Sequence, residues 1–488
     1  MTLAYDPMKT YLMTLLSLLL FSSLSPAQVD DFLKMHSEPG SLTNARAMAM
    51  GNAYSTFGYD FSAVRFNPAT LAVADSLTFS FGINYNVYPN SAEYQSQSIP
   101  FTTSNTALSQ FGMTFPISTP DRRAVLAAGY TVSQDLNRNL KFNGYNSATS
   151  TLVQDLTSQE NGIVNDLALN YPVFDTTGAP LEMATILTGG LQQDGYIVES
   201  GSVVNLSAGI STETARNVFF GASANYTIGT WTSDREFTET DVNDVYGAGT
   251  RTVPSDQYTA DFQSLYYHDV RDVVMKGFEL RLGLLYKFFD FISIGGSYKL
   301  STPHTLSETI TAEGTSRFAS GKRSIVEPDR NFSYTVAPAP EITLGASVNL
   351  WIITAMAEAT FVDYTQITYS DGPSTLQTSL YNKQAVDTYS RVLNLNGGAE
   401  FRLPFTGLSA RAGFMYRPSP YKTDKQEFDK KYLTLGVGMN SGGWLAFDVA
   451  YGYGWWKAVY RGSGQTFAGV IQNVQVHDVL TTIKVTVP

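Results

Sequence analysis

Apolar and polar residues alternate strictly over runs of about ten residues, and such runs recur along most of the chain. In residues 77–88 the odd positions hold Leu, Phe, Phe, Ile, Tyr and Val, and Thr, Ser, Gly and Asn stand between them. Residues 341–350 and 445–455 follow the same pattern. Successive side chains of a β-strand point to opposite faces of a sheet. The sequence therefore predicts many strands, each with one apolar and one polar face.

Two features of these faces favour a membrane barrel over a soluble sandwich, whose strands also alternate. The polar face is rich in Gly, Ser, Thr and Asn, and charged residues make up only 15% of the chain, against about 25% in an average soluble domain. The apolar face ends in aromatic residues such as Tyr453 and Trp455, as in the aromatic girdles at membrane interfaces. Because a sheet in lipid must close on itself, the predicted fold is an all-β, antiparallel transmembrane β-barrel.

The lengths of the predicted connections support this fold, because short and long connections alternate along the whole chain. Outer-membrane barrels have short periplasmic turns, long outer loops and an even number of strands. The fourteen predicted strands cover residues 77–88, 107–116, 123–135, 201–212, 217–235, 272–288, 291–305, 329–349, 352–369, 388–403, 407–417, 431–440, 443–458 and 467–487. The predicted long loops are residues 89–106, 136–200, 236–271, 306–328, 370–387, 418–430 and 459–466.

The N-terminal residues have the features of an export signal. Lys9 precedes an apolar stretch at residues 12–20, which is too short to span a bilayer, and the small residues Ser25 and Ala27 precede a cleavage position. We expect residues 1–27 to be a signal peptide. Three segments are thus predicted, namely the signal peptide, an N-terminal segment at residues 28–76 and a barrel at residues 77–488.

Composition excludes several classes of function. The chain has no cysteine and a net charge of −11, which argues against disulfide scaffolds, thiol chemistry and nucleic-acid binding. No G-x-S-x-G motif is present, and the histidines have no metal-binding spacing. We therefore expect no enzymatic activity, no cofactor and no metal site. The four histidines are His36, His268, His304 and His477.

Charged residues form two patterns. Five carboxylates lie in a segment predicted to be a loop, where they could bind calcium or bridge lipopolysaccharide phosphates through divalent cations, and a solvated acidic loop is the simpler alternative. These five are Asp234, Glu236, Glu239, Asp241 and Asp244. Charges of both signs on the polar strand face are predicted to line the lumen and to anchor a plug. They are Glu279, Arg281, Glu341, Glu358, Glu400, Arg402, Arg411 and Asp448.

Residues 28–76 show no sustained alternation and are too few for a core of their own. We expect a compact plug inside the barrel, because a disordered tail would leave its apolar residues without burial. Asn67-Pro68 is predicted to end a short helix, and Arg46 or Arg65 is predicted to pair with lumen carboxylates. The candidate contacts for a hydrophobic ligand are Phe57, Phe61, Phe66 and Leu71.

The plug segment resembles the hatch of the FadL/TodX-type outer-membrane transporters of long-chain fatty acids and other hydrophobic compounds. An Ala-Arg-Ala stretch with Met and Gly leads to an Asn-Pro-Ala motif just before the first strand. The residues that carry the resemblance are Ala45, Arg46, Ala47, Met50, Gly51, Asn67, Pro68 and Ala69. Residues 361–368, 416–421 and 429–432 also resemble segments of the family.

The resemblance implies a fourteen-stranded barrel with an N-terminal hatch, and diffusion of apolar ligands through a gap in the wall. We expect a monomer in the outer membrane of a Gram-negative bacterium, in contact with outer-membrane lipid and a hydrophobic ligand, and no nucleic-acid partner. Two alternatives stay open. One is a structural or assembly barrel that serves a secretion system, and the other is a porin for polar solutes.

Overall fold

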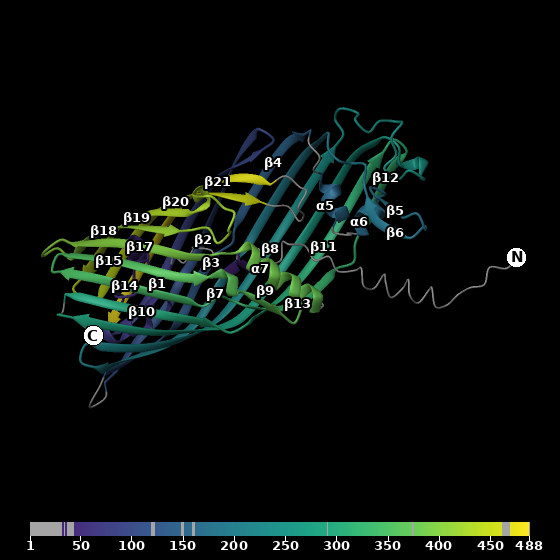
Figure 1. The fold of residues 1–488 in the computed structure, drawn as a ribbon. Coiled ribbons are helices and arrows are strands. Elements are labelled where there is room, and N and C mark those ends of the chain that lie inside the picture. The colour runs from purple at the N-terminus through teal and green to yellow at the C-terminus, as the bar shows by residue number, and fades with distance from the viewer. Residues whose placement is uncertain are drawn as a thin grey trace.

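The fold is a closed antiparallel β-barrel (Figure 1). The computed structural model describes residues 32–33, 35–36, 43–118, 123–147, 151–158, 162–289, 291–372, 375–460 and 469–487. Nineteen strands form one sheet, and pairing of the first strand with the last closes it. Because four barrel strands are interrupted and one further strand belongs to a hairpin beyond the wall, the barrel has fourteen strands, as predicted. The predicted signal peptide lies outside the described residues.

The elements have the following bounds. The continuous barrel strands are β1 (Leu77–Tyr94), β2 (Gln97–Ser118), β7 (Leu191–Ala215), β8 (Val218–Thr240), β9 (Phe262–Phe288), β17 (Arg391–Arg402), β18 (Leu408–Arg417), β19 (Lys430–Ser441), β20 (Leu445–Tyr460) and β21 (Val470–Val487). The interrupted strands are β3 (Arg123–Asp135) with β4 (Arg138–Asn146), β10 (Ile292–Ser301) with β11 (His304–Phe318), β13 (Arg330–Ala337) with β14 (Glu341–Leu350), and β15 (Ile353–Asp363) with β16 (Thr368–Ser370). The remaining elements are α3 (Ala45–Ala49), α4 (Ala63–Phe66), η1 (Pro68–Val73), α5 (Leu152–Ser158), α6 (Gly162–Asp166), β5 (Tyr171–Phe174), β6 (Pro180–Ala184), η2 (Gln257–Thr259), β12 (Gly321–Val326), η3 (Tyr364–Gln366), α7 (Thr375–Thr388) and η4 (Gln426–Phe428).

The two faces of the wall follow the predicted alternation. On β1, Phe79, Phe81 and Ile83 are 39% to 43% exposed on the outside, whereas Thr78 and Ser80 between them are buried. Leu344 and Phe447 are likewise exposed on β14 and β20. The apolar residues therefore form the outer surface of the barrel, and the polar residues face its interior. Among the residues that the structure describes, no helix has the length and hydropathy needed to cross a bilayer.

Two of the strand interruptions have a direct cause in the sequence. Pro303 separates β10 from β11, and Pro338 and Pro340 separate β13 from β14. Proline has no backbone N–H, so it cannot donate a hydrogen bond to the neighbouring strand. The sequence prediction treated residues 291–305 and 329–349 as single strands and missed both breaks.

At one end of the barrel the strands are joined by tight turns whose tips are aromatic. Phe289, Trp351 and Phe405 have φ angles of 52°, 49° and 66°, in the left-handed region that bulky residues rarely adopt. Their side chains and that of Trp444 are 56% to 102% exposed. These four turns join β9 to β10, β14 to β15, β17 to β18 and β19 to β20, so they follow one another around the rim.

At the other end, several predicted loops turn out to be regular structure. The strands β8 and β9 continue to Thr240 and from Phe262, so the predicted loop 236–271 is too long and the carboxylates at positions 234, 236 and 239 lie on a strand. The predicted loop 306–328 is largely a β11–β12 hairpin. The predicted loop 370–387 contains most of helix α7. Sequence alternation weakens where a strand leaves the membrane, because both faces can then be polar.

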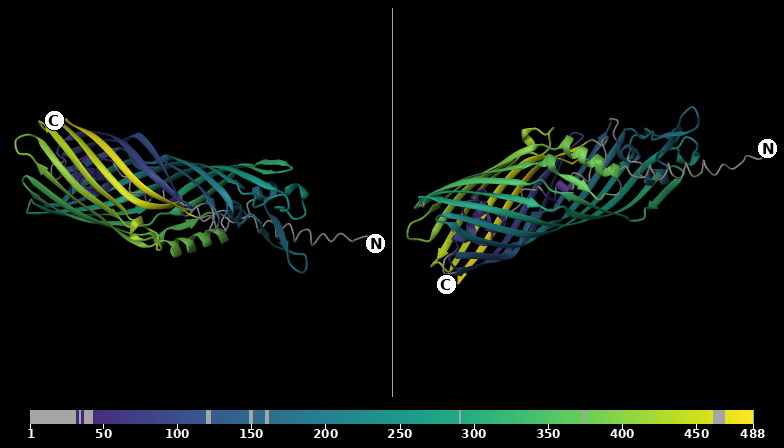
Figure 2. Two further views of the ribbon diagram at one scale, coloured as in Figure 1. Left: turned by 90° about the horizontal axis from the view of Figure 1, so that it is seen from above. Right: turned by 60° about the horizontal axis from the view of Figure 1, so that its bottom comes forward.

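Helices α5 and α6 and the β5–β6 hairpin lie at the end of the barrel opposite the C-terminus (Figures 1 and 2). They belong to the predicted long loop 136–200. Leu152, Val153, Leu156, Ile163 and Val164 of the two helices are buried, and they pack with inward residues of β4, β7, β8 and β9 in one hydrophobic cluster. This cluster, which we call the outer core, occupies that end of the barrel.

Candidate functional site

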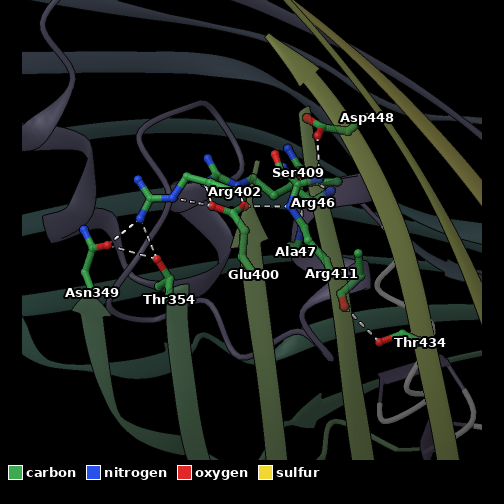
Figure 3. Close-up of polar contacts among 12 residues, drawn as sticks. Arg46, Ala47, Asn349, Thr354, Glu400, Arg402, Ser409, Arg411, Thr434 and Asp448 are labelled. Atoms are coloured by element: carbon green, nitrogen blue, oxygen red, sulfur yellow. Dashed lines mark hydrogen bonds and ion pairs between the residues drawn. The ribbon is translucent and has the colours of Figure 1, made fainter. Parts of the chain in front are cut away.

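Helix α3 is anchored to the barrel wall by a buried ion cluster (Figure 3). Its first turn is capped by Asn44, whose Oδ1 accepts hydrogen bonds from the backbone N–H groups of Arg46 and Ala47. Arg46 donates from Nε and Nη2 to the two carboxylate oxygens of Glu400 on β17, at 2.9 and 2.8 Å. Such two-point pairs fix orientation as well as supplying energy. The prediction that Arg46 or Arg65 pairs with a lumen carboxylate is confirmed for Arg46.

Other predicted lumen charges complete this cluster. Arg411 on β18 donates from Nε to Glu400 at 2.7 Å and pairs through Nη1 with Asp448 on β20 at 2.6 Å. Arg402 approaches Glu400 at 3.5 Å and donates to Thr354 and Asn349. Glu400 is 1% exposed, so its charge is offset by three arginines instead of water.

The segment after α3 is fixed by another carboxylate of the predicted set. Glu358 on β15 accepts hydrogen bonds from the backbone N–H groups of Tyr54 and Ser55, at 3.1 and 2.9 Å. The polar backbone of the segment is therefore satisfied by the wall, as a buried loop requires.

Asn67 ends helix α4, and Pro68 begins η1, as predicted. The Nδ2 of Asn67 donates to the backbone carbonyls of Ser55 and Leu284, and its Oδ1 accepts from the N–H of Ala69. One side chain thus joins the two halves of the segment to strand β9. This triple role explains why an amide residue precedes the proline here.

Glycines let the segment lie directly on the backbone of the wall. A Cβ atom at Gly398 of β17 would lie 2.3 Å from the carbonyl oxygen of Met50, and one at Gly413 of β18 would lie 2.2 Å from the backbone nitrogen of Gly51. Gly51 itself has a φ of 62°, which favours glycine. Any side chain at these positions would force the segment away from the wall.

The four candidate contacts for a hydrophobic ligand fall into two groups. Phe61 and Leu71 are fully buried in the core between the N-terminal segment and β3. Phe57 packs on Tyr54 and lies under the Arg46 guanidinium, 4.3 Å from its ring centre. Phe66 alone of the four lines an interior cavity.

That cavity, of about 390 Å³, lies in the barrel beside the N-terminal segment. Its apolar lining includes Phe66, Trp231 and Met275. Nine Lys and Arg and five Asp and Glu residues also line it, although the whole chain has a net charge of −11. The cavity is therefore positively charged in a negatively charged protein. The predicted lumen charges Glu279, Arg281, Glu341 and Glu358 are all part of the lining.

Some of these cations are paired and others are not. Lys299 pairs with Glu341 at 2.7 Å and approaches Glu279 at 3.6 Å. The guanidinium of Arg65, from α4, forms no ion pair or hydrogen bond with any residue that the structure describes. Nη1 of Arg417 is buried and has no hydrogen-bond partner within the described part of the chain. Burial lowers the pKa of the Arg65 guanidinium to about 10, which leaves it charged at neutral pH.

The sequence analysis missed the cavity roles of Lys299, Arg417 and Trp231. Lys299 lies on the same face of β10 as the inward residues Gly295 and Ser297, so alternation could have found it. Trp231 lies on the same face of β8 as Asn225, Thr227 and Gly229, so alternation could have placed it inside as well.

The barrel wall is open between β2 and β3. Hydrogen-bonded pairing of these strands stops at Gln110 and Thr131, and a bulge interrupts the β3–β7 pairing between Val132 and Gln134. A second cavity, of about 260 Å³, lies here. Asp135 at its edge accepts hydrogen bonds from Asn86 of β1 and Asn105 of β2, at 2.6 and 2.8 Å. Side-chain contacts thus replace the missing backbone pairing.

At the outer end, Glu239 holds helix α5 in place. Its Oε1 accepts from the backbone N–H of Leu152 at 2.7 Å and from Nε2 of Gln193 at 2.6 Å. Burial raises the pKa of the Glu239 carboxyl to about 7. The predicted acidic loop therefore contains one residue that faces inward and serves as a helix cap.

Comparison with known proteins supports the fold of the chain and does not identify its ligand. No protein-family model and no curated protein matches the chain. The toluene transporter TodX of Pseudomonas putida superposes with a TM-score of 0.52 at 14% identity, over 92% of this chain and 98% of TodX. A FadL homologue of Pseudomonas aeruginosa superposes with a TM-score of 0.53 at 15% identity, over 92% and 97% of the two chains. A TodX mutant described as a monoaromatic hydrocarbon channel gives 0.55 at 14%, over 91% and 99%.

The protein is thus a transmembrane β-barrel with the fold of the FadL/TodX-type transporters. The fold implied by the sequence resemblance is confirmed over nearly the whole described chain. The proteins that it resembles in structure are transporters and channels, not enzymes.

Proposed function

We propose that the protein lies in the outer membrane of a Gram-negative bacterium and mediates passive entry of hydrophobic small molecules. The observation that carries this proposal is an interior cavity close to a break in the barrel wall, with the N-terminal segment packed across the lumen. A polar-solute porin would have no need of the wall opening, and a purely structural barrel would have no need of the cavity.

The N-terminal segment acts as a hatch in this proposal. It is held by polar contacts to Glu400 and Glu358 and by close backbone packing on Gly398 and Gly413. A ligand that enters from the outer end is retained in the cavity and leaves sideways through the opening between β2 and β3 into the membrane. Burial in an apolar environment stabilises an alkyl chain by about 0.8 kcal/mol per CH₂, so lateral exit avoids returning that chain to water.

The charge of the cavity favours an amphiphilic anion such as a long-chain fatty acid. Arg65 and Arg417 offer a carboxylate two donor groups that no described residue occupies, and Phe66, Trp231 and Met275 offer apolar contacts to a chain. A neutral ligand such as toluene would leave both arginines without a counter-charge, which is costly in a buried site.

Quenching by a brominated fatty acid tests the proposal, because two of the five tryptophans in the chain, Trp231 and Trp456, line the cavity. We expect saturable quenching by a bromododecanoate that the double variant Trp231→Phe/Trp456→Phe largely removes. Trp444→Phe is the matched control, since Trp444 lies on an exposed turn, and it should leave the saturable part unchanged. Quenching that never saturates, or that survives the double substitution, would overturn binding in this cavity and favour the secretion-system alternative.

Deletion of residues 41–70 tests the hatch. We expect the wild-type protein to be nearly closed in planar bilayers and the deletion variant to conduct ions through an open lumen. Large, steady conductance of the wild-type protein would favour the polar porin. Equal, low conductance of both proteins would show that this segment plugs nothing.

A further inference from the structure

An imidazole and three carboxylates meet on the outer surface of the wall, on strands β8, β9 and β11. Glu236 and Glu313 each stand directly opposite His268 in the two ladders. Asp234 is on the same face of β8 as Glu236, because the two are separated by one residue. All four therefore point away from the lumen and play no part in the transport route proposed above.

Their donor atoms are close together. One nitrogen of His268 and one oxygen from each of Asp234 and Glu236 lie within 4.8 Å of one another. Nε2 of His268 is 2.9 Å from Oδ1 of Asp234, and Nδ1 is 3.1 Å from Oε1 of Glu313. Ligands around a tetrahedral ion at about 2.1 Å are about 3.4 Å apart, so small side-chain rotations would form a coordination shell.

The negative charge of this group is not neutralised by a basic side chain. No lysine or arginine in the described part of the chain forms an ion pair with Asp234, Glu236 or Glu313. Asp272 adds a further carboxylate on the same face of β9, where it accepts a hydrogen bond from Thr232. A cation is thus favoured at this position.

The group also lies outside the apolar belt. Val274, 39% exposed, lies toward the membrane on the same strand, and His268 is roughly 20 Å further along the strand at 3.3 Å per residue. Towards the opposite end, the outward residues Phe278, Leu280 and Leu282 are all apolar and exposed. The four side chains therefore stand in water beyond the outer membrane surface.

We infer that Asp234, Glu236 and His268 bind one divalent transition-metal ion, with Glu313 as the carboxylate that orients the imidazole through Nδ1–H. A mixed set of imidazole and carboxylate donors suits zinc and its neighbours, whereas calcium and magnesium select oxygen donors alone. An Nδ1–H that donates to a carboxylate is the usual support of a histidine that binds metal through Nε2. Bound metal would join β8 to β9 beyond the apolar belt.

Zinc titration of the full chain tests this site. The protein, purified in detergent, freed of any polyhistidine tag and stripped with EDTA, should bind one equivalent of Zn²⁺ in calorimetry. His268→Gln and Asp234→Asn should each lower the affinity at least 100-fold, and Glu313→Gln should lower it 10- to 100-fold. His477→Gln is the matched control, because His477 is also on the outer face but contacts Tyr451 and no carboxylate. It should change nothing.

Any one of three results would overturn the inference. These are failure of the wild-type chain to bind Zn²⁺ stoichiometrically, binding of Zn²⁺ by His268→Gln as tightly as by the wild-type chain, and tighter binding of Ca²⁺ than of Zn²⁺ by the wild-type chain. Circular dichroism of each variant establishes that the barrel is folded, and the control at position 477 separates site-specific loss from a general effect of removing a surface histidine.

Discussion

Arg46 and Glu400 are 354 positions apart in sequence, yet two parallel hydrogen bonds join the guanidinium of one to the carboxylate of the other. Glu400 also receives Arg411, which continues to Asp448. Removing one partner of a buried ion pair leaves an uncompensated charge, which typically costs 3–5 kcal/mol. The N-terminal segment is therefore held at helix α3 by electrostatics and further along by hydrogen bonds to Glu358.

Arg46→Ala should loosen the N-terminal segment. Because Arg46 is partly exposed, we expect a loss of about 3 kcal/mol at this anchor, seen as frequent opening events in planar-bilayer recordings. Arg402→Ala is the control, since Arg402 is more exposed and approaches Glu400 only at 3.5 Å. If opening events are as rare in both variants as in the wild-type protein, the ion cluster does not hold the segment.

The outward residues of the strands should contact lipid. Spin labels at positions 79, 81 and 447 should be relaxed strongly by oxygen, which is lipid-soluble, and labels at 80 and 448 should not. Phe447→Arg should destabilise the barrel by about 2–4 kcal/mol near the bilayer midplane. Equal oxygen accessibility at neighbouring positions would contradict the assignment of the outer face.

The two ends of the barrel should differ in access from outside the cell. An epitope tag in the β8–β9 connection, residues 241–261, should bind antibody on intact cells. A tag at Gly442-Gly443, in the turn between β19 and β20, should bind antibody only after the outer membrane is opened. Labelling of the second tag on intact cells would invert the orientation.

The attachment of helix α5 should weaken as pH rises. Burial raises the folded-state pKa of Glu239 to about 7, above the 4.5 that is ordinary for a glutamate, so the folded form binds the proton more tightly than the unfolded form. The resulting stabilisation is fully present below about pH 4.5 and is lost as pH rises through 7, with an upper value of about 3 kcal/mol.

Hydrogen exchange of residues 152–158 measures this effect. After correction for the intrinsic pH dependence, protection should be greater at pH 5 than at pH 8. Glu239→Gln keeps a side chain that can accept from Leu152 without carrying charge, so its protection should no longer fall between these pH values. The same fall in Glu239→Gln would assign the pH dependence to another group.

The barrel itself could be predicted from the sequence because the membrane imposes its rule on every strand. Phe81 and Ser80 had to face opposite sides, and the number of strands followed from counting such runs. Beyond the membrane a strand no longer needs one apolar face, and the prediction from alternation failed there. Glu236 and Glu239 were assigned to a loop because their strand has no apolar face at that height.

The candidate site was predictable in its charges and less so in its shape. The odd–even alternation of side chains along each strand placed Glu400, Arg411 and Glu358 inside, and the Asn-Pro-Ala motif located the helix end at Asn67. Sequence patterns give no information on the distances between side chains. They could not show that Phe61 and Leu71 pack into a core while Phe66 borders the cavity. They also could not show that the Arg65 guanidinium has no hydrogen-bond or ion-pair partner in the described part of the chain.

The aromatic turns have a mechanical consequence for how the barrel sits in its membrane. Phe289, Trp351, Phe405 and Trp444 mark consecutive turns on one part of this rim, whereas the turn between β7 and β8 carries Arg216 and Asn217. Aromatic rings favour the headgroup layer, and charged side chains favour water. We therefore expect the aromatic turns to sit deeper in the membrane surface than the charged turn, so that the barrel axis leans away from the membrane normal.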